Sequence, residues 1–209
     1  MCFLFPRKNK ECYIEMFQYL LDVCTRENLE LNITHLNLDF EYAAHEAARH
    51  FWPDVTIKGC QFHLAQAWYR KIQSLGLTSE YKDQESPVGQ WLKTFFGLSF
   101  LDPDVEECFV FDIFSEAPES EKAIKSADYV VNNYIDKSST FPPITSADSD
   151  VECKRTTNGC ESFHKEFSTM FYCSHPNIFD FLARIQSVQT KSYLKIRAAR
   201  KNIPLGRKQ

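Results

Sequence analysis

The chain has 209 residues, of which 44% are hydrophobic and 25% are charged, as is typical of one globular domain or a little more. No apolar run approaches the 18 residues that a membrane-spanning helix needs, and the apolar start lacks the basic flank of a signal peptide. We therefore expect an intracellular protein. Its eight cysteines are too sparse for a small disulfide scaffold, so we expect buried thiols or occasional metal ligands.

Charge is distributed unevenly along the chain, although the net charge is only −4. Residues 1–150 hold 13 basic and 24 acidic side chains, whereas residues 151–209 hold 11 basic and 4 acidic ones. Residues 184–209 carry eight basic side chains and no acid. Such an arm suits a polyanion such as nucleic acid, and a solvated basic helix end explains it equally well.

The first 76 residues alternate between short apolar runs and amphipathic segments. The apolar runs predict strands, and the segments with hydrophobic residues at intervals of three and four predict helices. The expected strands cover 2–5, 33–38 and 55–59, and the expected helices cover 10–25, 40–50 and 61–75. This alternation predicts an α/β sheet that is at least partly parallel, with functional residues at the strand ends.

The pattern becomes helical after Gly76. Helices are expected at 88–96, 105–114 and 120–134, followed by a polar, proline-containing loop at 136–149. Two further helices are expected at 158–170 and 178–200. We therefore predict an α/β unit, a helical insertion, and helices that return to the sheet.

Asp39 lies where an apolar strand is expected to end and a helix to begin. A carboxylate at such a place can face a divalent cation held by the loops beyond the sheet. Aspartate is also a favoured helix N-cap. Position alone favours the cap.

Cys60 and His63 are spaced as a Cys-x2-His pair that could supply two ligands to zinc. A structural zinc site needs four ligands, and Cys160 with His164 is the comparable second pair. Two isolated pairs are a weak signal. A buried cysteine next to a packed histidine is therefore the favoured alternative, and zinc is not expected.

Asn158, Glu161 and Lys165 share one face of an expected helix, with His164 at its margin. Glu161 could direct a carboxylate toward the end of the sheet, with Asn158 beside it. Asn158 as N-cap and Glu161 at the third helical position also fit a capping box. The spacing alone favours the box.

The order of these residues carries more information than any one of them. Two groups of motifs stand out. The first group is Asp39-Phe-Glu-x-Ala, Phe51-x-Pro and Gly59-Cys-x-Phe-His63 with Gln66, and the second is Thr-x-Asn158-Gly-x-Glu161-x-Phe-His164 with His175-Pro-Asn-Ile-x-x-Phe181. In this order they resemble Mutator-like element (MULE) transposases, over residues 3 to about 185.

The resemblance implies a partial RNase H-like fold, a mixed sheet with flanking helices, and DDE transposase chemistry. In that family three carboxylates hold two Mg²⁺ or Mn²⁺ ions, which drive DNA strand cleavage and strand transfer. The resemblance makes Asp39 and Glu161 the second and third carboxylates. It gives Asn158, Cys60, His63 and His164 supporting roles. It also implies a nuclear protein, otherwise a cytoplasmic one, and it leaves homo-oligomers open.

The same resemblance divides the chain into four parts. Residues 1–77 correspond to a partial core, 78–150 to the helical insertion, 151–185 to the returning helices, and 186–209 to the basic arm. In the arm, Arg197, Arg200 and Lys201 are the expected contacts to DNA phosphates.

The family's first catalytic aspartate has no counterpart in these residues, because no aspartate precedes Asp22. We therefore expect a transposase fragment, or a domain that is catalytically inactive as given. Two carboxylates would hold one cation weakly. The alternative is a domesticated or decayed module that binds DNA or protein without catalysis.

Overall fold

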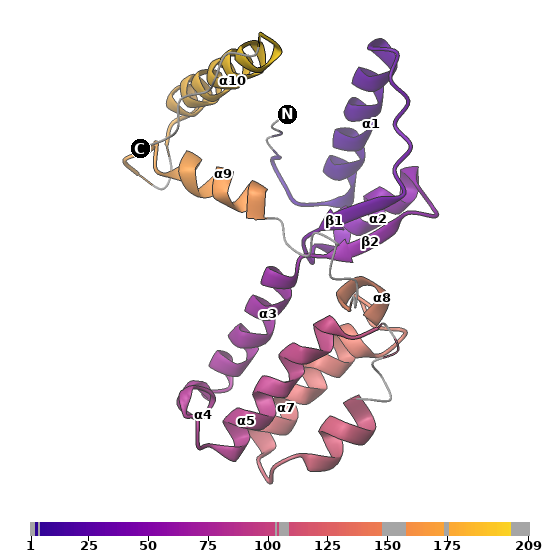
Figure 1. Cartoon of the computed structure of the whole chain (residues 1–209), viewed down its shortest axis with the longest axis vertical. Helices are drawn as coiled ribbons and strands as arrows, with labels where there is room; N and C mark the ends of the chain where they lie inside the picture. The colour runs from indigo at the N-terminus through magenta and orange to yellow at the C-terminus, as the bar shows by residue number, and fades with distance from the viewer. Residues whose placement is uncertain are drawn as a thin grey trace. The chain divides into compact units, whose positions relative to one another are not determined.

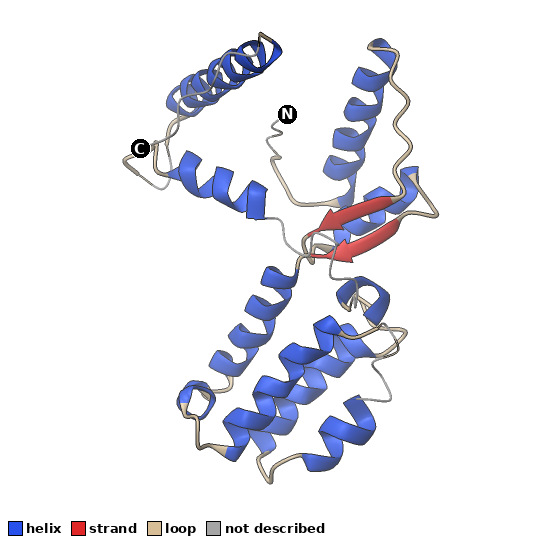
Figure 2. Ribbon diagram, viewed as in Figure 1, coloured by secondary structure: helices blue, strands red, loops and turns tan. Residues whose placement is uncertain are grey.

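A computed structural model describes residues 3, 5–102, 104, 109–147, 158–173 and 176–201, without the side chains of 110, 111 and 158–161. The chain divides into two compact units, Met1–Thr157 and Asn158–Gln209, and each is described by itself. Helices make up most of the described chain, beside one pair of strands (Figures 1 and 2). No helix in the described ranges is both long and apolar enough to cross a membrane.

The first unit contains a parallel β-α-β arrangement, as the alternating pattern predicts. Strand β1 (His35–Leu38) leads through helix α2 (Tyr42–Phe51) to strand β2 (Thr56–Gly59). The strands pair in parallel, and Leu38 lies opposite Gly59 at their carboxyl ends. This two-stranded parallel sheet in a mostly helical chain is compatible with the predicted α/β class, whereas the RNase H-like fold stays a prediction. Of the strand expected at 2–5, residues 2 and 4 fall outside the described residues, and residues 3 and 5 are not in a strand.

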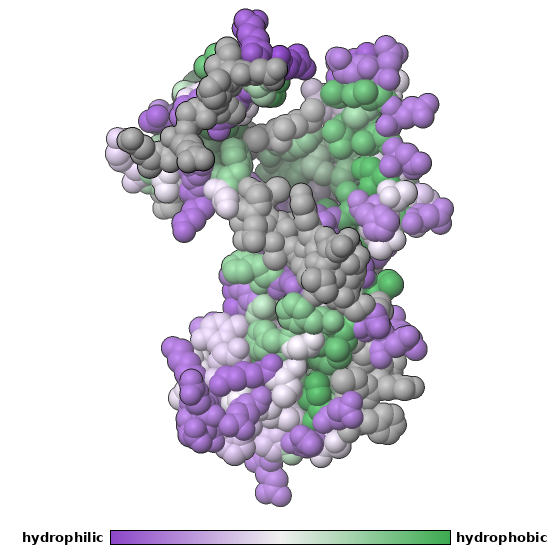
Figure 3. Space-filling view, viewed as in Figure 1, coloured by the Kyte–Doolittle hydropathy of each residue, from purple (hydrophilic) through white to green (hydrophobic). Residues whose placement is uncertain are grey.

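Helix α1 (Lys10–Arg26) packs against α2, as its amphipathic pattern predicts. The Asn9 side chain caps the helix by accepting a hydrogen bond from the Cys12 amide at 3.2 Å. Phe17 is buried and makes edge contacts with the rings of Phe51 and Trp52 at centroid distances of 6.2 and 5.3 Å. Figure 3 shows hydrophobic residues gathered along one side of the α1 region and hydrophilic ones along the other.

Helix α3 (Gln61–Ser74) links the sheet to the larger hydrophobic core. Leu64, Trp68 and Ile72 recur every four residues, so they form one buried stripe. This stripe packs toward α7 (Glu121–Val130). The chain then turns at Gly76, whose φ of 72° lies in the left-handed region that glycine tolerates best.

The rest of the first unit is the predicted helical block. Its other elements are α4 (Thr78–Lys82), α5 (Pro87–Thr94), η1 (Phe95–Phe100), η2 (Phe109–Ile113), η3 (Phe114–Glu116) and η4 (Val131–Ile135). Part of the helix expected at 105–114 falls outside the described residues. Within the described ranges, a core of sixteen mostly aromatic and aliphatic residues joins this block to α3.

The loop expected at 136–149 contains a short helix, α8 (Pro143–Ser146), so that prediction was incomplete. Proline is favoured at the first helical position, because its fixed φ suits a helix and its missing N–H is not needed there. Thr145, Ser146 and Ala147 are buried. The Lys58 ammonium on β2 donates to the Ala147 carbonyl at 3.0 Å, which holds the α8 segment against the sheet.

The second unit contains α9 (Asn158–Ser168) and α10 (Ile178–Arg200), close to their predicted bounds. Phe167, Phe171 and Phe181 pack ring against ring where the two helices meet. Asn177 caps α10 by accepting from the Asp180 amide at 2.9 Å. His175 of the second motif group lies outside the described residues. The predicted return of 151–185 to the sheet stays a prediction.

Candidate functional site

Asp39 directly follows β1, and its backbone is held from two sides. Its carbonyl accepts hydrogen bonds from the Glu41 amide at 2.7 Å and from the His45 imidazole Nε2 at 2.8 Å. Glu41, rather than Asp39, is the N-cap residue of α2, and its side chain makes no cap hydrogen bond. The N-cap alternative for Asp39 is therefore wrong, and its carboxylate stays about half exposed at 53%.

His45 fixes this turn from inside the protein. It is 1% exposed, and burial lowers its pKa below the ordinary value because the charged form would lose its hydration. The imidazole is therefore neutral near pH 7, with Nε2 carrying the proton that it donates to the Asp39 carbonyl. A neutral, buried donor holds the backbone of Asp39 without adding charge beside its carboxylate.

Phe40 anchors the other side of the same turn. Its ring packs edge-on against Tyr134 and Phe141, at centroid distances of 5.5 and 5.1 Å. The ring also covers Gly59, where a Cβ atom would overlap it. Glycine is therefore required at position 59 because the Phe40 ring packs closely against its backbone, and not because the backbone has an unusual angle.

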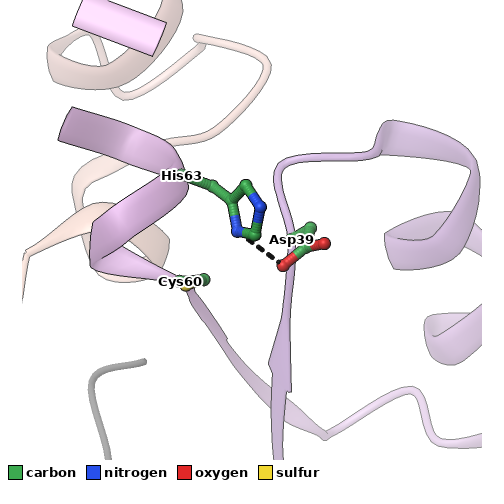
Figure 4. Close-up of side chains that lie close together, drawn as sticks. All are labelled: Asp39, Cys60 and His63. Carbon is green, nitrogen blue, oxygen red and sulfur yellow. Dashed lines mark ion pairs between the residues drawn. The ribbon is translucent and has the colours of Figure 1, made fainter. Parts of the chain in front are cut away.

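Cys60 and His63 follow β2 as Asp39 follows β1. The Cys60 amide donates to the Leu38 carbonyl at 2.9 Å, which extends the pairing of the strands by one residue. Cys60 precedes the first turn of α3 and is 1% exposed. His63 lies one turn into α3, and its Nδ1 faces the Asp39 Oδ1 at 3.0 Å (Figure 4).

These three side chains form one cluster at the carboxyl edge of the sheet. One donor atom from each of Asp39, Cys60 and His63 lies within 4.8 Å of the other two. Local spacing in the sequence does not connect Asp39 with the Cys-x2-His pair, and it offers Cys160 and His164 as the further ligands of that pair. The register of the two strands is the signal that brings these residues together, because residues that directly follow paired parallel strands lie at the same edge of the sheet.

The residues predicted around Glu161 belong to the other unit. Helix α9 begins at Asn158, but the side chains of Asn158, Cys160 and Glu161 lie outside the described part of the structure. Both the capping box and the metal-ligand role therefore stay predictions. His164 is exposed, and its ring contacts that of Phe163 at a centroid distance of 5.7 Å.

Arg197, Arg200 and Lys201 are exposed at the carboxyl end of α10. Three more basic side chains, Arg184, Lys191 and Lys195, are exposed along the same helix. Cations in a last helical turn are favoured by the helix dipole, and they can also contact phosphates. Both interpretations of the arm therefore remain compatible with its geometry.

The donor types at the cluster differ in the metals that they suit. The Asp39 carboxylate fits a hard cation such as Mg²⁺ or Mn²⁺ as one of its oxygen ligands. Cys60 and His63 offer sulfur and nitrogen, which suit zinc and similar transition metals. Of these three side chains, that of Asp39 is the one that offers the oxygen ligand preferred by the expected Mg²⁺ or Mn²⁺.

Comparisons of the chain with protein-family models, with curated proteins and with solved structures found no match in any of the three.

Proposed function

We propose that this chain is part of a MULE-type DNA transposase domain and acts on DNA in the nucleus. One observation supports the proposal above the others. Asp39 and the Cys60-x2-His63 pair, which come from separate motifs of the resemblance, meet at one edge of a parallel strand pair. Strand ends of this kind are where open α/β folds bind their ligands.

In this proposal Asp39 binds the catalytic cation, and Glu161 supplies a further carboxylate. The bound Mg²⁺ or Mn²⁺ would activate the attacking oxygen and stabilise the leaving one. His45 and Phe40 hold the backbone on each side of the Asp39 carboxylate, so they orient it toward the cation. His63 faces the same carboxylate and limits the positions that it can adopt.

The basic side chains of α10 supply the contact to DNA in the proposal. Its last two turns expose Arg197, Arg200 and Lys201, and no acidic residue follows Asp180. Contacts of this kind bind phosphates without reading sequence and weaken steeply as salt rises.

The proposal is tested by binding of the intact chain to labelled duplex DNA, followed by fluorescence anisotropy at about 50 and 200 mM salt. We expect binding that weakens as salt rises. We also expect Mn²⁺ to strengthen it for the wild type and not for Asp39→Asn, with the exposed Asp54→Asn as matched control. Absence of DNA binding at the lower salt would contradict the proposal.

DNA cleavage is considered separately from DNA binding. Asp39 and Glu161 correspond to the second and third catalytic carboxylates of the resemblance, and the first has no counterpart in the 209 residues. We expect no strand cleavage from them alone in Mg²⁺ or Mn²⁺. Metal-dependent nicking of labelled DNA that disappears in Asp39→Ala would prove this expectation wrong and would make the chain a complete catalyst.

The second candidate function is a DNA-binding module without catalysis. The observation that favours it is the basic surface of α10, which does not involve Asp39. This candidate predicts the same salt dependence, but identical DNA binding by wild type and Asp39→Asn whether or not Mn²⁺ is present.

A further inference from the structure

We infer that Asp39, Cys60 and His63 together form a binding site for one zinc ion. The set consists of one oxygen, one sulfur and one nitrogen donor, all within 4.8 Å of one another. Zinc binds these three donor types and commonly keeps three protein ligands when its fourth position is left to water or a substrate. A Mg²⁺ site would not use the thiol, so the ligand set of this site differs from the one expected for transposition, although both include Asp39.

The distances are close to those that a tetrahedral ion needs. With metal–ligand bonds of about 2.0–2.3 Å, neighbouring donors lie about 3.3–3.8 Å apart. His63 Nδ1 and Asp39 Oδ1 lie 3.0 Å apart, so they need to separate by a few tenths of an ångström. Every other donor distance is at most 4.8 Å, so the longest of them would need to shorten by about 1 Å.

The backbone around the three ligands is already fixed. The Asp39 carbonyl is bound by the buried His45, and the Cys60 amide is bound to β1. Cys60 also lies at the N-cap position of α3, so its backbone is fixed by both the strand and the helix. Since the ligands need little reorganisation, the cost of ordering them on binding is small.

The burial of the ligands is graded across the site. Cys60 is 1% exposed, whereas the side chains of His63 and Asp39 are 30% and 53% exposed. The sulfur therefore forms the floor of the site, and the imidazole and the carboxylate form its rim. An ion held there has an open side toward solvent, where water or a ligand oxygen can complete its coordination.

This inference does not depend on the proposed function, although both use Asp39. It predicts that zinc and Mn²⁺ compete for the chain. It also predicts that they differ in their remaining ligands, because only zinc requires the Cys60 sulfur.

The test uses Co²⁺, a coloured substitute for zinc, titrated into the intact reduced chain and followed by absorbance. We expect one equivalent of Co²⁺ to give a sulfur-to-cobalt charge-transfer band and the intense visible bands of a tetrahedral ion, both removed by added Zn²⁺. Cys60→Ser should abolish the charge-transfer band. His63→Asn and Asp39→Asn should each weaken Co²⁺ binding by more than about 10-fold, since even outer-shell losses cost 10–100-fold.

Matched controls separate this site from other thiols and imidazoles. Cys12→Ser on α1 and His50→Asn on α2, neither of which belongs to the cluster, should leave the spectrum unchanged. Serine is close in size to cysteine and is a favoured N-cap, so Cys60→Ser should fold, as circular dichroism will check. If Cys60→Ser does not fold, the inference is tested instead by the weaker Co²⁺ binding expected of His63→Asn.

Absence of a charge-transfer band in the wild type, or its full retention in Cys60→Ser, would overturn the inference. A Mn²⁺ titration separates this result from the proposed function. Mn²⁺ binding that survives Cys60→Ser but not Asp39→Asn supports the transposase proposal, whichever way the Co²⁺ result falls.

Discussion

Gly59→Ala is the change that most sharply tests the packing around the site. Gly59 has an ordinary backbone conformation, so alanine there would normally stabilise the fold by about 0.4–1 kcal/mol through the unfolded state. The Phe40 ring occupies the place of the new methyl group, however, and Tyr134 and Phe141 limit its movement. Overpacking of this kind costs about 1–3 kcal/mol.

We therefore expect Gly59→Ala to lower the melting temperature by roughly 2–12 °C, at about 2–4 °C per kcal/mol for a chain of this size. The cost should vanish once the ring is removed. In a Phe40→Ala background, Gly59→Ala should be neutral or stabilising, so the two changes have a coupling energy of about 1–3 kcal/mol in a double-mutant cycle.

Urea unfolding of the four proteins, monitored by circular dichroism, measures this coupling. A cycle in which the two changes simply add, within about 0.5 kcal/mol, would refute the contact between Phe40 and Gly59. The reasoning would also fail if Gly59→Ala alone stabilised the protein, since the ring would then not fill that space.

Three further predictions concern the buried histidine, the core and the arm. Burial lowers the pKa of His45, so the unfolded chain binds a proton at this residue more readily than the folded chain does. The free energy of unfolding should therefore fall as the pH drops below about 6.5. His45→Gln should reduce this loss, as measured by urea denaturation at several pH values with a chelator present. Trp68→Ala, at a side chain only 3% exposed, should cost about 3–5 kcal/mol in urea unfolding, whereas Tyr172→Ala at a fully exposed ring should cost almost nothing. Changing Arg197, Arg200 and Lys201 to glutamine should reduce the slope of log affinity for DNA against log salt by up to about 2.7, and a matched triple change at lysines of α4 and α7 should leave that slope unchanged.

The sequence predicted most helices and the parallel strand pair because each has a clear hydrophobic period. Helix α1 is a good example, since its hydrophobic residues recur at intervals of three and four and its predicted range of 10–25 agrees with Lys10–Arg26. Helix α8 was missed, because a helix of four residues that begins at Pro143 is too short to show a hydrophobic period. Its position is set by tertiary contacts such as that of Lys58 with the Ala147 carbonyl.

The sequence predicted the individual residues of the candidate site, but not that their side chains lie together. Asp39, Cys60 and His63 were each singled out from local spacing, which says nothing of distances across a sheet. The register that pairs Leu38 with Gly59 brings them together, and register depends on packing of both strands. The favoured cap at Asp39 was wrong because the chain makes a further turn before α2 begins.

The most direct test of the central claim is Mn²⁺ binding by the intact chain, followed by electron paramagnetic resonance of the unbound ion. If Asp39 and Glu161 belong to one catalytic site, Asp39→Asn and Glu161→Gln should each weaken binding, and the double variant should lose little more than either single one. Glu166→Gln, on the same helix as Glu161, is the control and should bind as the wild type does. Unchanged Mn²⁺ binding in Glu161→Gln would contradict the shared site, and with it the transposase proposal for this chain.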